Sequence, residues 1–371
     1  MNPLPLGRRL LVGLAVATLV GGCSTSASPS SSPTTAPSAS VSPVSLPTTP
    51  GPPSGSPAVA TMTQVVGTSS RVSLDRGTVT TDAKGVQHAR GGTVVVQDAV
   101  DDPRVGGTTT MTWNMDYWGT PDWSQGALVQ WGTARIVNSG GAWEGNATGV
   151  SSTDRGDIDA TWYTGTGGYA GLGYFRLSTS ADLSAGVTRR WNIRGLIFPG
   201  DPPHLAGVPP VTGPPPMPNV SPVPTAPPAP TASSIAYGPT SVVTGASEFT
   251  FIDLDPGAFA AVVTSNDPRV SGAFLARPWT MRFAPFPGQE FGIGTQWGAG
   301  RLENAGGTWQ GVAEGIYDER GDVVITWYKG TGAYAGLSFF ELVTRKDVFG
   351  PTAELGYGNY GLIFPGDPPT P

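Results

Sequence analysis

The stretch WGTARIVNSGGAWEG, residues Trp131–Gly145, decides the fold because it occurs twice. It returns as WGAGRLENAGGTWQG at Trp297–Gly311, 166 residues later. Further pairs of matching segments lie on both sides: Asp102–Val105 and Asp267–Val270, Arg155–Asp157 and Arg320–Asp322, Gly165–Leu172 and Gly330–Leu337, Gly195–Pro203 and Gly361–Pro369. The repeated unit has about 130 to 140 residues, which is enough to enclose its own core. We therefore expect two copies of one domain.

Each copy has the residue pattern of β-strands. Ile158, Ala160 and Trp162 alternate with other residue types, and about eight such runs per copy are separated by Gly and Asn/Asp turns. Short connections favour antiparallel neighbours, and closure of the sheet leaves no exposed edge. The sequence therefore predicts an all-β chain with two tandem antiparallel eight-stranded β-barrel modules. A two-sheet sandwich is the structural alternative.

Proline separates these modules from the rest of the chain. The 371 residues include 38 Pro, concentrated in residues 24–60 and 199–239. Ser, Pro, Thr and Ala dominate the first stretch, which has too little apolar surface to offset the entropy of ordering. We expect a disordered tether at 23–60, module 1 at 61–200, a Pro-rich linker at 201–239 and module 2 at 240–371.

The N-terminus has the pattern of an export signal. Arg8 and Arg9 precede an apolar run that is too short to span a bilayer, and small residues follow it. Leu19–Cys23 resembles the bacterial lipobox, which implies a lipoprotein signal peptide at 1–22 and lipidation of Cys23, the one Cys of the chain. The expected location is extracytoplasmic, with Cys23 anchored to the membrane by lipid. An ordinary signal peptide and twin-arginine export are alternatives.

Charge and rare residue types exclude several kinds of function. A net charge of −6 without a Lys/Arg cluster argues against a nucleic-acid partner. The chain has 2 His, and no pair of a nucleophile and a base emerges, so we expect no catalytic residue, metal or cofactor. Asp157 and Asp159 are a candidate acid/base or calcium pair, but Asp159 corresponds to Val324 in the second copy. We interpret the pair as part of a solvated turn.

The segment Gly165–Leu172, between a Gly-x-Trp-x-Gly strand and a closing Gly-Leu-Ile-Phe strand, resembles the allene oxide cyclase and dirigent-type β-barrel group. The resemblance covers roughly the last two thirds of each module. It implies an eight-stranded barrel with an apolar interior that takes a small hydrophobic molecule. The catalytic residues of the plant enzymes have no match in this sequence, so the resemblance does not extend to cyclase activity. The glycines of Gly165–Leu172 resemble a nucleotide-binding loop, but a strand rather than a helix follows, and we assign them to a barrel corner.

Recurring aromatic residues are the candidate ligand-lining set: Trp143, Trp162, Tyr169, Trp309, Trp327 and Tyr334. Plain core packing is the alternative role. Trp162 and Trp327 share strand parity with apolar neighbours, which predicts that they face the barrel interior. The expected function is a non-enzymatic binding role for an exported lipid-anchored protein, with a small apolar ligand or a wall polymer as partner. An allene oxide cyclase-like isomerase or cyclase and a wall carbohydrate-binding module are the alternatives.

Overall fold

The computed structural model describes residues 62–180, 189–203, 210–211, 235–249, 252–255, 257–265, 267–287, 292–344 and 357–369. All of them belong to Ser56–Pro371, so the predicted signal peptide, the tether and Cys23 lie outside the described residues. The described chain is all-β and contains no α-helix. Within these residues, no helix has the length and apolarity needed to cross a membrane.

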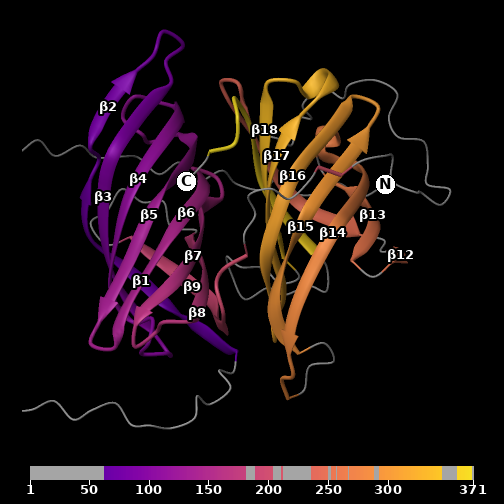
Figure 1. Cartoon of the computed structure of the whole chain (residues 1–371). Coiled ribbons are helices and arrows are strands. Elements are labelled where there is room, and N and C mark those ends of the chain that lie inside the picture. Colours follow the sequence, from indigo (N-terminus) through magenta and orange to yellow (C-terminus); the bar gives the residue numbers. More distant parts are fainter. Residues whose placement is uncertain are drawn as a thin grey trace, which may run out of the picture. The chain divides into compact units, whose positions relative to one another are not determined.

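Module 1 is a closed antiparallel barrel of eight strands (Figure 1). The strands are β1 (Thr63–Asp75), β3 (Gln87–Val100), β4 (Gly107–Gly119), β5 (Gly126–Asn138), β6 (Gly141–Ser152), β7 (Gly156–Gly167), β8 (Leu172–Ser180) and β9 (Arg190–Pro199). Neighbours in sequence pair from β3 to β9, and β1 closes the ring by pairing with both β9 and β3. A short strand, β2 (Thr78–Thr81), pairs antiparallel with Gln87–Arg90 at the start of β3. The predicted barrel is confirmed for this module, and the sandwich is excluded.

Module 2 repeats this strand order in a ten-stranded antiparallel sheet. The strands are β10 (Ile235–Tyr237), β11 (Thr240–Phe249), β12 (Ile252–Asp255), β13 (Ala258–Thr264), β14 (Gly272–Ala284), β15 (Ile293–Asn304), β16 (Gly307–Asp318), β17 (Gly321–Gly330), β18 (Leu337–Thr344) and β19 (Tyr357–Pro365). Among the described residues, the pairing of β11 with β13 involves Glu248 with Thr264 and Phe249 with Val263 alone. This sheet is therefore less completely closed than the barrel of module 1.

The repeated sequence motif forms the closed end of the module 1 barrel. The side-chain amide of Asn138 donates to the backbone oxygens of Pro103, Arg104 and Gly106 at 3.3, 2.8 and 3.4 Å. The indole Nε1 of Trp143 donates to the Arg104 oxygen at 2.7 Å. The turn that contains the repeated Asp-Pro-Arg-Val segment is thereby fixed across the end of the barrel.

Module 2 builds the same end from the equivalent residues. Asn304 donates to the backbone oxygens of Arg269 and Ser271 at 3.0 and 2.9 Å, and Trp309 donates to the Arg269 oxygen at 2.8 Å. Tyr334 in turn donates its hydroxyl hydrogen to Oδ1 of Asn304 at 2.7 Å. These contacts explain why Asn and Trp recur at fixed spacing in the two copies.

Glycines in the motif are required by close approach and by backbone conformation. A Cβ atom on Gly140 would lie 2.3 Å from the hydroxyl oxygen of Tyr169, and one on Gly306 would lie 2.3 Å from that of Tyr334. Gly171 has φ +82°, in the left-handed region that side chains disfavour. Leu172 then begins strand β8, so the prediction that these glycines form a corner before a strand is confirmed.

The prediction that Trp162 and Trp327 face the interior is wrong. Tyr163 belongs to the interior cluster with Trp143, and side chains alternate along β7, so Trp162 points outward. There Trp162 packs against Phe175 at a ring separation of 4.7 Å. The equivalent Trp327 packs against Phe340, also at 4.7 Å. The apolar residues of β7 lie on its outer face, because its interior face carries polar residues such as Asp157 and Asp159.

Replacing Asn138 with Ala tests the closed end of the barrel. Asn138→Ala removes the donor that holds the turn and also the oxygen that accepts from the Tyr169 hydroxyl, so we expect the free energy of unfolding to fall by about 2–3 kcal/mol. Urea denaturation followed by circular dichroism measures this change. Asn146→Ala, at an exposed position on β6, is the control and should change stability by less than about 0.5 kcal/mol. Equal effects of the two variants would contradict the structural role of Asn138.

Candidate functional site

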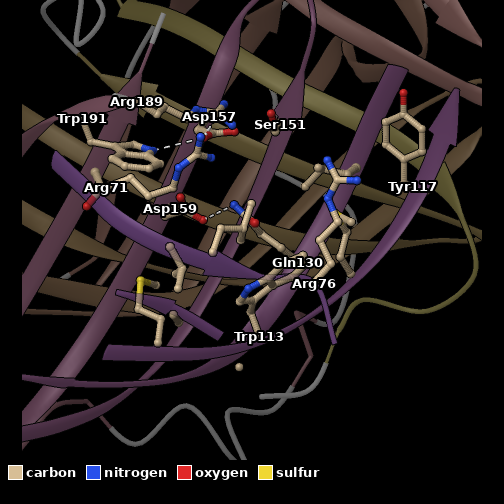
Figure 2. A pocket seen from close by; sticks show the side chains of 18 of the residues that line it. Arg71, Arg76, Trp113, Tyr117, Gln130, Ser151, Asp157, Asp159, Arg189 and Trp191 are labelled. Carbon is tan, nitrogen blue, oxygen red and sulfur yellow. Dashed lines mark hydrogen bonds and ion pairs between the residues drawn. The ribbon is translucent and has the colours of Figure 1, made fainter. Parts of the chain in front are cut away.

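The other half of the module 1 barrel contains a cavity of about 740 Å³ (Figure 2). Its apolar wall comes from strands β3, β4, β5 and β9 and includes Val94, Met111, Trp113, Met115, Leu128 and Trp191. Its polar lining comes chiefly from β1, β5, β6, β7 and β8 and includes Arg71, Gln130, Ser151, Asp157, Asp159 and Arg176. The cavity is therefore amphipathic, with aromatic walls and a cluster of ionisable groups.

A buried ion pair separates this cavity from the packed half of the barrel. Arg176 on β8 donates to Asp98 on β3 through Nη1 at 2.8 Å and Nη2 at 3.1 Å. Strands β9 and β1 lie between β8 and β3, so the guanidinium reaches across the interior. Ser178 accepts from Nε at 2.9 Å, and Thr109 donates to the Asp98 carboxylate. Both charges are thus paired and hydrogen-bonded, as buried charges must be.

Asp157 organises a second group of polar side chains. Arg189 pairs with its Oδ2 at 2.5 Å, and the indole Nε1 of Trp191 donates to the same oxygen at 3.1 Å. Figure 2 shows Arg71 beside these three residues. Burial lowers the pKa of Arg71, and the positive charge of Arg189 lowers it further, although the Asp157 carboxylate opposes the shift. Two guanidinium groups therefore lie near one carboxylate.

Asp159 has the most strongly perturbed acidity among the side chains that line the cavity. Gln130 donates from Nε2 to its Oδ1. Burial in the barrel raises the pKa of Asp159 from 3.8 to about 8, and the negative charge of Asp157 adds to the shift against the opposing charges of Arg189 and Arg176. At neutral pH this carboxyl group is mostly protonated. It therefore offers an O–H donor to a molecule in the cavity.

The interpretation of Asp157 and Asp159 as a solvated turn is wrong. Asp157 is buried and Asp159 is half-buried, and both line the cavity. Alternation on β7 places both on the interior face together with Thr161 and Tyr163. The difference between Asp159 and Val324 in the two copies therefore does not mark an unimportant position.

The open end of the barrel carries a further aromatic group. Tyr117 and Trp123 stack with ring centroids 5.0 Å apart, and the guanidinium of Arg76 lies 4.6 Å from the Trp123 ring. Trp123 has φ 66°, an uncommon conformation for a residue other than glycine. Its Nε1 donates to Oε1 of Gln87 at 2.6 Å. All of these except Gln87 border the cavity.

The six aromatics predicted to line a ligand site lie elsewhere. Trp143 stacks on Tyr169 at 5.1 Å and Trp309 stacks on Tyr334 at 4.8 Å, each pair beside the closed end of its own module. Trp162 and Trp327 point outward, as described above. None of the six borders the cavity of module 1. The aromatic residues that do border it, such as Trp113 and Trp191, were not among the candidates.

In the part of the chain that the structure describes, no group of three or more His, Cys, Asp or Glu side chains is arranged to hold a metal ion. Comparison with family models, with curated proteins and with solved structures finds no match for this chain. The function therefore has to be argued from the cavity itself.

The raised pKa of Asp159 predicts a pH-dependent effect of Asp159→Asn. The native state holds a proton that the unfolded chain releases above its ordinary pKa, so the aspartate costs stability increasingly from about pH 4 to pH 8. Asparagine has no proton to hold. The variant should therefore become more stable than wild type across this range, by up to a few kcal/mol.

Urea denaturation at several pH values measures this difference. Glu144→Gln is the control, because Glu144 is exposed on the outside of the same barrel. A stability difference between Asp159→Asn and wild type that stays constant with pH would show that Asp159 titrates as a solvated group.

Proposed function

We propose that this chain is an exported, lipid-anchored cell-surface protein whose first barrel binds a small molecule with a largely apolar body. The cavity of module 1 is the observation that carries the proposal. Its volume of about 740 Å³ is within the usual range for small-molecule sites, and such sites combine apolar walls with a few fixed polar groups. Trp113 and Trp191 supply flat apolar surfaces, and the Asp159 carboxyl supplies a hydrogen-bond donor.

We also propose that module 2 is a second barrel of the same kind with a more completely packed interior. Val263 and Phe274 occupy the positions of Asp98 and Thr109, and both belong to the buried apolar cluster of module 2. Val324, at the position of Asp159, packs against the same cluster. These substitutions replace polar groups by apolar ones, which favours module 1 as the ligand-binding module.

Export and anchoring rest on the sequence alone. The apolar run after Arg9, the small residues before Cys23 and the Pro-rich tether are together typical of a bacterial lipoprotein. A ligand-binding domain at the end of such a tether would be held at a distance from the membrane.

A second candidate function is an isomerase or cyclase that uses Asp159 as a proton donor. A carboxyl group with a pKa of about 8 is suited to general acid catalysis near neutral pH. It lines the cavity beside Gln130 and Asp157. Chemical change of a bound ligand that is abolished in Asp159→Asn would favour this function over simple binding.

Filling the cavity tests ligand binding directly. Leu128→Trp adds an indole to the cavity wall on β5, and we expect affinity for a cavity ligand to fall at least about tenfold, because the larger side chain takes the volume that the ligand needs. A library of small aromatic and aliphatic compounds, screened by the change in tryptophan fluorescence, supplies the ligand.

Val137→Trp is the matched control for this experiment. Val137 is an exposed position on the same strand, so the control adds the same side chain outside the barrel. Equal affinity of the two variants for the ligand, with both shown to be folded by circular dichroism, would place binding outside the cavity.

Cys23→Ala tests the anchoring proposal. Lipid attachment needs the Cys23 thiol, so the variant should be found as an unprocessed precursor or as a soluble form, whereas wild type should fractionate with membranes. Mass spectrometry of the mature wild-type N-terminus should show a lipid-modified Cys23. A mature chain without lipid would contradict the proposed location.

A further inference from the structure

We propose that the polar end of the module 1 cavity binds the anionic group of an aromatic carboxylate. This inference rests on the proposed function, because it names the chemical class of the cavity ligand. Its basis is the charge balance around Asp157, an unpartnered donor on Arg189 and the aromatic walls nearby.

The polar end of the cavity has more cationic than anionic groups. Among the residues that the structure describes, Arg71, Arg176 and Arg189 border the cavity, and the carboxylates of Asp98 and Asp157 lie near them. Asp98 is fully occupied by Arg176, and Asp157 lies near both of the other guanidinium groups. In this described part of the site, three guanidinium groups thus share the carboxylates of Asp98 and Asp157, so cationic groups outnumber these anionic ones.

The remaining ionisable groups do not reverse this balance. Asp159 is mostly protonated at neutral pH because its pKa is about 8. Asp122 is exposed at the open end of the barrel, where Arg76 also lies. An anion near Arg71 and Arg189 would therefore meet a net positive environment and a carboxyl hydrogen from Asp159.

Arg189 provides a hydrogen-bond donor that the described protein groups leave unused. Its Nε is buried and has no hydrogen-bond partner among them, while its Nη2 lies against Asp157. A buried donor without a partner destabilises a protein unless a ligand or water satisfies it. Burial is the largest cause of the lowered pKa of Arg71, and the positive charges of Arg189 and Arg76 lower it further. A bound carboxylate would accept a hydrogen bond from Nε of Arg189 and would offset the positive charges around Arg71.

The apolar part of the cavity favours an aromatic ring on the ligand. Trp191 lies beside Asp157, and Trp113 lies farther along the cavity wall (Figure 2). Indole rings interact with other aromatic rings through stacked or edge-on contacts in addition to the burial of apolar area. A ring system attached to the carboxylate would therefore rest between the indoles while the charged group reaches the arginines.

Three ligands of similar shape test this inference: naphthoate, naphthylmethanol and naphthylmethylamine. We expect naphthoate to bind the full chain about 10 to 100 times more tightly than the alcohol near neutral pH, because its hydrogen bonds involve charged groups. The amine should bind most weakly. Isothermal titration calorimetry measures the three affinities. The preference for naphthoate should decline above about pH 8, where Asp159 ionises, and this decline should be absent in Asp159→Asn.

Arg71→Gln should reduce the ratio of naphthoate affinity to alcohol affinity at least about fivefold while alcohol binding is retained. Arg135→Gln, an exposed arginine on the outer face of β5, should leave the ratio unchanged. Equal binding of acid and alcohol by wild type, or a preference for the amine, would overturn the anion inference while leaving the proposed binding function in place. No binding of any of the three would count against the inference and the proposed function together.

Discussion

The ion pair between Arg176 and Asp98 determines how the interior of the first barrel is used. On one side of it the barrel is packed with aromatic residues that stack against the closed end. On the other side lies the cavity. Removing either partner alone would leave an unpaired buried charge, which is strongly destabilising. The pair thus fixes a boundary between a structural half and a half that is open to a ligand.

The second module shows what happens at the same positions without this pair. Glu341 stands in place of Arg176, and Val263 in place of Asp98. Glu341 accepts from the Tyr328 hydroxyl at 2.9 Å and from the Asn359 amide at 2.7 Å, and burial raises its pKa to about 7. The repeated motif that closes the barrel end is retained, while the interior polar groups differ. The two copies share the hydrogen bonds at the closed end, whereas the polar groups in the rest of the interior differ between them.

This contrast explains which features the sequence could predict. The repeat and the strand pattern were sufficient to predict an all-β chain, a barrel for module 1 and the corner formed by Gly165–Leu172. The prediction that Trp162 on β7 faces inward was wrong, because the usual rule that apolar residues face inward does not hold where the interior is a polar cavity. Asp159 was dismissed since Val324 replaces it, yet a difference between two copies is what a site present in one copy would produce.

Other contacts of the site could not be predicted from a single sequence, because they join residues that are distant in the chain. Arg176 and Asp98 are 78 residues apart, and only barrel closure brings β8 and β3 to opposite sides of one interior. Arg71 on β1 and Arg189, just before β9, likewise approach Asp157 from positions that are distant in the chain. The aromatic candidates are residues that occur at equivalent positions in both copies. Such residues include Trp143 and Trp309, which stabilise the end that both modules share.

The proposed chemistry of the cavity depends on the first barrel holding Asp159 where its charged form is disfavoured. The most direct measurement is the titration of the Asp159 side-chain carboxyl by carbon NMR, assigned by loss of the signal in Asp159→Asn. We predict a midpoint near pH 8. A midpoint near pH 4, the ordinary value for a solvated aspartate, would contradict the account.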